Sequence, residues 1–130
     1  MDRLIESVLK SGVGCYVGNV ASSILMYADD IVLLAPTRSA MQRLLCLCEE
    51  FCIKYKLDFS PDKCETLLLG FDSTNFELYI NNKLIPLHHK VKHLGHHILN
   101  NRQLYDLNYM ISDIKTRTNV MMSIFNFLDN

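Results

Sequence analysis

Apolar residues recur at helical spacing in three stretches of the chain. In residues 2–11 they occupy one face, and Gly12 follows as a stop. Residues 38–56 follow Thr37, and either Thr37 or Ser39 can cap this helix. The apolar positions of this second stretch are Met41, Leu44, Leu45, Cys48, Phe51, Cys52 and Tyr55. A third helical pattern begins beyond Arg102.

Shorter apolar runs between these stretches predict strands. Residues 14–20 suit one short strand, and residues 24–35 are apolar on both sides of two adjacent acids. The second run therefore predicts a strand, a tight turn with the acids at its tip, and another strand. Pro36 ends it.

Three more strand signals follow the second helix. Residues 66–71 form a β run, and residues 76–85 read as a hairpin around Asn81-Asn82 because asparagine tolerates positive φ. Residues 91–94 form a further strand before Gly95. Helices and strands in this order predict an α+β fold with antiparallel strands packed on helices.

Composition limits the class of protein. The 130 residues suffice for one core, and 49% hydrophobic content excludes a disordered chain. Neither a secretory signal nor an apolar run of membrane-spanning length is present, so we expect no membrane partner. Five cysteines without a framework pattern favour a reducing compartment, either the nucleus or the cytoplasm.

Charge is unevenly distributed although the net charge is only −1. From Leu78 to Tyr105 the chain has no Asp or Glu, while it contains three lysines, Arg102 and all five histidines. This stretch is either a surface that meets nucleic-acid phosphates or simply a solvated face.

The adjacent carboxylates of Asp29 and Asp30 are the main candidate for chemistry. Like charges a few ångströms apart destabilise a turn unless a cation compensates them. Mg²⁺ or Mn²⁺ is a suitable cation, because it binds one or two carboxylates together with phosphate oxygens and water. The alternative is that the two aspartates are ordinary turn residues.

Three motifs in order resemble reverse transcriptases of non-LTR (LINE-type) retrotransposons. Residues 27–35, Tyr-Ala-Asp-Asp-Ile-Val-Leu-Leu-Ala, are similar to the catalytic hairpin of that family, and residues 11–18 to the segment before it. Residues 57–64 are similar to the next motif, a turn with a lysine, and residues 91–95 to the primer grip. The resemblance covers about residues 2–100.

The resemblance implies a partial polymerase palm in residues 1–100 and the helical start of a thumb or connection in residues 101–130. It implies RNA-directed DNA polymerase activity, with an RNA template, a DNA primer and deoxynucleoside triphosphates as partners. Asp29 would ligate the metal and Asp30 would support it. Lys63 would protonate the leaving pyrophosphate, the alternative being a solvated surface lysine.

Four further residues would contact the primer end or the nucleotide: Tyr27, Ala28, Leu94 and Gly95. For Tyr27 the alternative is an ordinary strand aromatic, and for Gly95 a plain turn glycine. The chain departs from the family pattern at Ser60 and His93. It also has Lys56 where glycine often follows the helix, so we expect the usual left-handed helix cap to be missing.

The family's third carboxylate and its glycine-rich pocket segment would lie upstream of these residues. We therefore expect a fragment that does not polymerise efficiently alone and that either joins the missing polymerase segments or self-associates. The alternative function is a truncated or domesticated palm that binds nucleic acid or protein.

Histidine and cysteine spacing suggests a second metal site only weakly. His89 and His93 are four residues apart, which places them together only on a helix, and Gly95 and the strand pattern oppose a helix there. Cys46, Cys48 and Cys52 contain no paired zinc spacing and are interpreted as small core residues.

Overall fold

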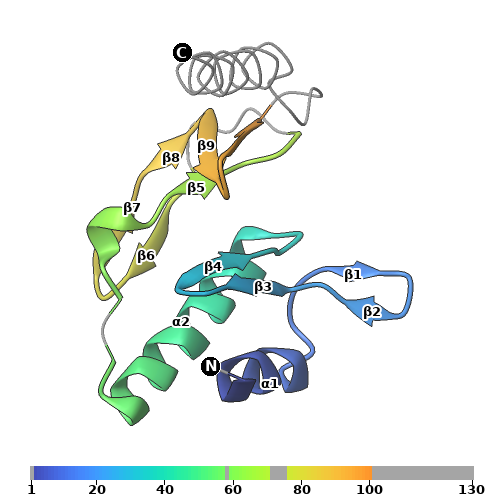
Figure 1. Cartoon of the computed structure of the whole chain (residues 1–130), viewed down its shortest axis with the longest axis vertical. Coiled ribbons are helices and arrows are strands. Elements are labelled where there is room, and N and C mark those ends of the chain that lie inside the picture. Colours follow the sequence, from blue (N-terminus) through green and yellow to red (C-terminus); the bar gives the residue numbers. More distant parts are fainter. Residues whose placement is uncertain (1, 58, 71–75, 101–130) are drawn as a thin grey trace, which may run out of the picture. The chain divides into compact units, whose positions relative to one another are not determined.

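The computed structural model describes residues 2–57, 59–70 and 76–100 (Figure 1). Within these ranges it contains two α-helices and several antiparallel strand pairs, which confirms the predicted α+β class. The described residues form two compact units, one of residues 2–66 and 76–87 and the other of residues 67–70 and 88–100. The helical pattern beyond Arg102 and the predicted thumb lie outside the described residues.

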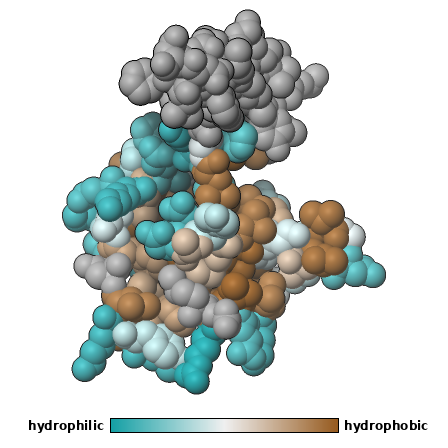
Figure 2. Space-filling model, viewed as in Figure 1, coloured by the Kyte–Doolittle hydropathy of each residue, from teal (hydrophilic) through white to brown (hydrophobic). Residues whose placement is uncertain are grey.

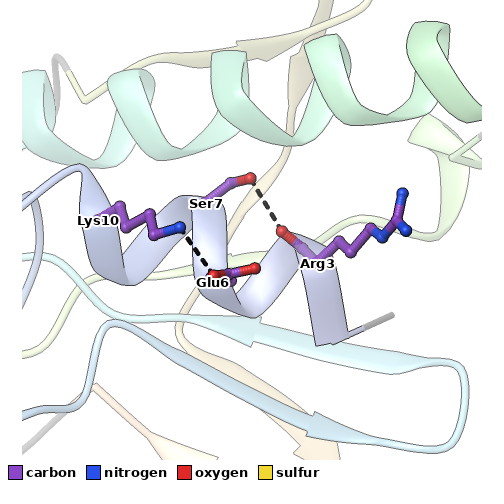
Figure 3. Close-up of polar contacts among 4 residues, drawn as sticks. All are labelled: Arg3, Glu6, Ser7 and Lys10. Carbon is purple, nitrogen blue, oxygen red and sulfur yellow. Dashed lines mark hydrogen bonds and ion pairs between the residues drawn. The ribbon is translucent and has the colours of Figure 1, made fainter.

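Helix α1 (Asp2–Lys10) confirms the first helical pattern. Its buried face carries Leu4 and Val8, both with no exposed surface. On its outer face Lys10 Nζ lies 2.7 Å from Glu6 Oε1, and Ser7 Oγ donates to the Arg3 carbonyl at 2.8 Å (Figure 3). The pKa of the Glu6 carboxyl is lowered because Lys10 donates this hydrogen bond to its charged form.

Helix α2 (Arg38–Tyr55) begins and ends with local contacts of its own. Thr37 is the cap, since its Oγ1 accepts a hydrogen bond from the Ala40 N–H at 3.2 Å. The expectation that a left-handed cap is missing is wrong. Lys56 itself adopts φ 51° and ψ 42°, and its N–H points to the carbonyls of Cys52 and Ile53. The carbonyls at the helix end gain a donor only when this lysine adopts a left-handed conformation, which glycine adopts at a lower cost.

The first core joins both helices to the hairpin of β3 (Ile24–Tyr27) and β4 (Asp30–Leu33). Its buried residues are Leu4, Val8, Ile24, Leu44, Cys48 and Phe51. Burial raises the pKa of the Cys48 thiol to about 12. Cys48 and Cys52 are thus core residues as predicted, whereas Cys46 is exposed.

Residues 14–20 do not form the single strand that their pattern predicts. They contain β1 (Tyr16–Val17) and the start of β2 (Val20–Ala21), which pair antiparallel as a short hairpin. Gly18, at φ 60°, lies between the two strands and breaks the run. The apolar side chains of Tyr16, Val17 and Val20 remain exposed, and apolar surface is visible at this hairpin in Figure 2.

The predicted hairpin around Asn81-Asn82 is confirmed as β6 (Leu78–Ile80) and β7 (Lys83–Ile85). Both asparagines have positive φ, 50° and 59°, as the tight turn requires. Buried side chains of this hairpin and of α2 form the second core, which consists of Leu45, Leu78, Ile80 and Ile85.

A polar contact also holds β6 to α2. Gln42 Oε1 accepts a hydrogen bond from the Tyr79 N–H at 3.0 Å, and Gln42 Nε2 donates one to the Tyr79 carbonyl at 2.8 Å. Arg38 Nε donates to the Glu77 carbonyl at 2.8 Å. The amide of Gln42 thus satisfies the strand backbone as a neighbouring strand would.

Between α2 and β6 the chain forms a 3₁₀ helix, η1 (Pro61–Lys63), and β5 (Thr66–Leu67). The strand predicted over residues 66–71 is shorter than its β run, and Phe71 lies outside the described residues. The Thr66 N–H donates to the Pro86 carbonyl at 2.9 Å.

Strand β8 (Leu87–His88) is followed by β9 (Lys90–His93) and β10 (His96–Leu99). The β9–β10 pair is antiparallel and confirms the strand predicted before Gly95. The Asn100 N–H donates to the His89 carbonyl at 3.0 Å and the Gly70 N–H to the Asn100 carbonyl at 3.4 Å, which ties residue 70 to this unit. Neither helix within the described ranges has the length and hydropathy of a membrane span.

Candidate active site

The hairpin of β3 and β4, which we call the acidic hairpin, has a defined register. Tyr27 lies opposite Asp30, and Met26 lies opposite Ile31. Only Ala28 and Asp29 stand between the two strands, so the connection is a two-residue turn. The prediction of a strand, tight turn and strand is therefore confirmed. Asp29 lies at the tip, whereas Asp30 is already the first residue of β4.

Alternation along the strands sorts the side chains of this hairpin onto two faces. Ile24, Met26, Ile31 and Leu33 pack on the first core. Tyr27 and Asp30 share the opposite face, and Tyr27 is 66% exposed. Residues directly opposite have Cβ atoms about 5 Å apart. An aromatic ring and a carboxylate thus lie side by side on the solvent face, next to the turn that carries Asp29.

The turn itself is strained at Ala28, whose φ is 53°. A residue with a Cβ atom in this region is destabilised by roughly 1–2 kcal/mol relative to right-handed backbone. The chain therefore holds the acidic turn in a costly conformation, which the packed strands on both sides maintain.

Neither carboxylate is compensated within the part of the chain that the structure describes. Asp29 and Asp30 are both exposed, and neither has a hydrogen-bond or ion-pair partner among the described residues. Two adjacent anions without a partner create a local demand for a cation. Oxygen ligands at an exposed turn fit Mg²⁺, which takes one or two carboxylates and completes its shell with water or phosphate oxygens.

The base of the hairpin depends on two residues for which the sequence pattern gave no role. Ser23 precedes β3 and is 1% exposed, and its carbonyl accepts the Leu34 N–H at 2.8 Å. Gly14, at φ 119°, lies against this base so closely that an added Cβ would collide with Ser23. A glycine in a run of small residues was the only signal in the sequence.

Lys63 lies at the end of η1 and is exposed. It belongs to the same compact unit as the acidic hairpin. The neighbouring Asp62 pairs with Lys83 of β7 at 3.6 Å, on the exposed surface. The structure thus places the lysine motif on a short 3₁₀ turn, as the turn prediction expects.

Leu94 and Gly95 form the two-residue turn between β9 and β10, with φ 48° and 82°. They belong to the second compact unit, and Asp29 and Asp30 to the first. Positive φ at Gly95 explains why glycine suits this position, while Leu94 adopts the same region at a cost.

The histidines do not adopt a helical arrangement, as expected. His93 lies opposite His96 in the β9–β10 pair. Among the described residues no group of three or more His, Cys, Asp and Glu side chains is arranged to hold a metal ion. The metal hypothesis therefore rests on the two carboxylates of the acidic hairpin together with ligands from outside it.

Comparison with known proteins decides the family. The family described as "Reverse transcriptase (RNA-dependent DNA polymerase)" matches residues 1–98, about three quarters of the chain. The chain belongs to the reverse transcriptase family. The resemblance to reverse transcriptases that the sequence motifs predict is thus confirmed.

One relative, from Drosophila melanogaster, is encoded by a retrotransposable element. This protein is the retrovirus-related Pol polyprotein from the type-2 retrotransposable element R2DM, and it is 40% identical to the chain over 67 residues. That match covers 52% of the chain and 6% of the polyprotein. No solved structure shows significant similarity to the chain.

Proposed function

We propose that this chain supplies the metal-binding carboxylates of an RNA-directed DNA polymerase from a retrotransposon. The observation that carries the proposal is the acidic hairpin, which presents Asp29 and Asp30 exposed and without a partner among the described residues. Membership of the reverse transcriptase family gives these carboxylates a reaction, namely transfer of a deoxynucleotide to a primer paired with RNA.

Asp29 and Asp30 would hold Mg²⁺ or Mn²⁺ as neighbouring oxygen ligands. The turn is short, and its strands are anchored in the first core, so the carboxylates are held on a rigid element. When bound, the ion lowers the pKa of the primer 3′-hydroxyl and stabilises the leaving pyrophosphate. The bond that forms joins the primer 3′-oxygen to the α-phosphorus, and the bond that breaks releases pyrophosphate.

Other residues would position the substrates. Tyr27 shares a face with Asp30 and offers an exposed ring to the primer end. Ala28 adds only a methyl group beside the acids, which leaves room for the nucleic acid. Lys63 would donate a proton to the pyrophosphate, and Leu94 with Gly95 would contact the primer.

A second candidate function is a nucleic-acid binding module without catalysis. Between residues 67 and 70 and between residues 88 and 100, the described part of the second unit holds lysines and histidines but no carboxylate. Such a surface binds polyanions whether or not the acidic hairpin is active. Both candidates include nucleic acid as a partner, and they differ in the role of Asp29.

The decisive experiment is a Mn²⁺ titration of the 130-residue chain, followed by its paramagnetic resonance signal. We expect Asp29→Asn and Asp30→Asn each to weaken Mn²⁺ binding by about tenfold or more, because each removes a charged ligand from a small set. Glu50→Gln is the matched control, since it removes an exposed carboxylate of α2. Equal affinity in Asp29→Asn and the parent chain would overturn the metal assignment.

Primer extension then separates the two functions. Chain, RNA template, DNA primer, labelled deoxynucleotides and Mn²⁺ are incubated with an Asp29→Asn control. We expect the chain alone to incorporate no nucleotide, because the family's site needs a third carboxylate besides the two of the acidic hairpin. Incorporation that disappears in the control would show that the chain completes the site, for example as a dimer. Metal binding without incorporation would favour a contributor to a larger polymerase.

A further inference from the structure

The β1–β2 hairpin presents a strand edge that is open to a further strand. Within the described residues its sheet has only two strands, so β1 pairs with β2 on one side and with no strand on the other. The hairpin projects beyond α1 and the acidic hairpin in Figure 1. Because an isolated two-stranded hairpin is only marginally stable in water, an added strand stabilises it.

The register shows which backbone groups lie on this outer edge of β1. Opposite residues of an antiparallel pair alternate between hydrogen-bonded and non-hydrogen-bonded rungs. The Ser22 N–H donates to the Cys15 carbonyl at 2.8 Å, so Cys15 and Ser22 form a bonded rung. Tyr16 and Ala21, which lie opposite each other on the next rung, are therefore a non-bonded pair. The backbone N–H and C=O of Tyr16 thus point away from β2.

The side chains beside this edge are apolar and exposed. Tyr16 is 53% exposed, and on the other face of the hairpin the opposed Val17 and Val20 are 71% and 67% exposed. From Ser11 to Ala28 the chain contains no charged residue and no proline. Charged side chains and proline are usual means by which natural proteins keep a strand edge from pairing with another chain. The edge of β1 has neither of these protections.

We propose that the outer edge of β1 pairs with the same edge of a second copy of this chain. A two-fold axis beside Tyr16 brings the two β1 strands together antiparallel, so the Tyr16 N–H of each copy donates to the Tyr16 carbonyl of the other. The two tyrosine rings then form a cross-strand aromatic pair on one face of the joined sheet. Val17 of each copy lies on the opposite face.

Charge and size favour a second copy as the partner. An uncharged edge meets no like-charge repulsion when an identical edge lies opposite it. The same edge offers no cation to a nucleic-acid phosphate and no charge to a charged peptide. Since β1 is short, the contact buries much less than the roughly 1,600 Å² of a standard stable interface, so the dimer is weak and reversible. This inference goes beyond the proposed function and does not depend on the acidic hairpin.

Sedimentation velocity of the full chain over a wide range of concentration tests the association. We expect a monomer at about 5 μM and a substantial fraction of dimer at about 500 μM, as befits an interface of this size. Asp29→Asn should associate like the parent chain, so failure of the metal assignment leaves this result unaffected. A chain that stays monomeric throughout the range would overturn the proposal.

A charged substitution locates the contact. Val17→Lys should weaken dimerisation by about tenfold or more, because the lysines of the two copies lie on one face near the two-fold axis and repel each other. Ile53→Lys is the matched control, since Ile53 is 79% exposed on α2 and away from any strand edge. A dimer that persists in Val17→Lys, or that is lost equally in Ile53→Lys, would overturn the proposal.

Amide hydrogen exchange tests the same contact in the parent chain without any substitution. The Tyr16 N–H lies on the outer edge, so its exchange should slow as the protein concentration rises. The Val17 N–H is the internal control, because its rung with Val20 is already hydrogen-bonded within the hairpin by the same alternation. Exchange of the Tyr16 amide at the same rate in dilute and concentrated protein would overturn the proposal.

Discussion

The backbone of Gly14 lies so close to Ser23 that no other residue fits at position 14. A Cβ atom added there would collide with the Ser23 side chain and lie 3.1 Å from the Leu34 carbonyl oxygen. Ser23 and Leu34 are the residues on which the acidic hairpin begins and ends, and they are joined by a backbone hydrogen bond. Gly14 therefore fixes the base of the hairpin that carries Asp29 and Asp30.

We expect Gly14→Ala to lower the free energy of unfolding by about 3 kcal/mol, because it combines overpacking at a buried serine with an unfavourable φ. Gly18→Ala is the matched control. Gly18 has φ 60° but no atom within 4 Å of an added Cβ, so only the backbone strain of about 1 kcal/mol applies. Urea denaturation followed by circular dichroism measures both. Equal losses would show that the contact with Ser23 is not tight.

Substitutions at Ala28 should report the strain in the acidic turn. At φ 53°, a β-branched side chain is more strongly disfavoured than a methyl group. Ala28→Val should therefore lower the thermal midpoint, with a loss of about 1–2 kcal/mol, whereas Ala28→Gly should leave it unchanged or raise it. If valine were tolerated as well as glycine, the turn would not have a left-handed residue at this position.

Loss of the Gln42 side chain should loosen β6 from α2. Gln42→Ala removes two hydrogen bonds to the Tyr79 backbone, and we expect a loss of about 1–2 kcal/mol. Arg43→Ala, on the exposed side of the same helix, should change stability by less than about 0.5 kcal/mol. Hydrogen exchange of the Tyr79 amide gives a local readout. Unchanged protection in Gln42→Ala would contradict the contact.

The left-handed end of α2 offers a stabilising substitution. Lys56→Gly should raise the free energy of unfolding by about 0.5–1 kcal/mol, because glycine adopts φ 51° without the Cβ penalty. Lys54→Gly, inside the last turn, should instead cost about 1 kcal/mol through lost helix propensity. Thermal unfolding measures the stability of both variants. A gain for Lys56→Gly together with a loss for Lys54→Gly would place the end of α2 between these two positions.

The thiols should differ in reactivity with iodoacetamide. Burial raises the pKa of Cys48 from its usual 9.0 to about 12, so this thiol stays protonated and covered at pH 8, whereas Cys46 is exposed. Mass spectrometry should find Cys46 labelled first. Since the folded-state pKa is the higher one, the Cys48 contribution to stability is complete below pH 9.0 and is lost as pH rises toward about 12. Early labelling of Cys48 would contradict its place in the core.

Local sequence chemistry was enough to predict the helices and strands nearest the acidic hairpin. The period of apolar residues predicts both described helices, and the paired asparagines at positions 81 and 82 predict their hairpin. Two acids between two apolar runs predict the acidic hairpin, because alternation and turn chemistry are properties of neighbouring residues. The motif order also predicts the reverse transcriptase family.

Contacts between distant segments decided the remainder. Residues 14–20 form a hairpin and not one strand, and Gly14 is fixed by Ser23 and Leu34. Gln42 reaches a strand 37 residues away, and Lys56 accepts a left-handed backbone because carbonyls at the helix end need a donor. A sequence pattern reports periodicity and turn preference, but not which distant backbone a side chain meets. The sequence therefore determined the carboxylates and their turn, and only the tertiary structure determined which residues hold that turn in place.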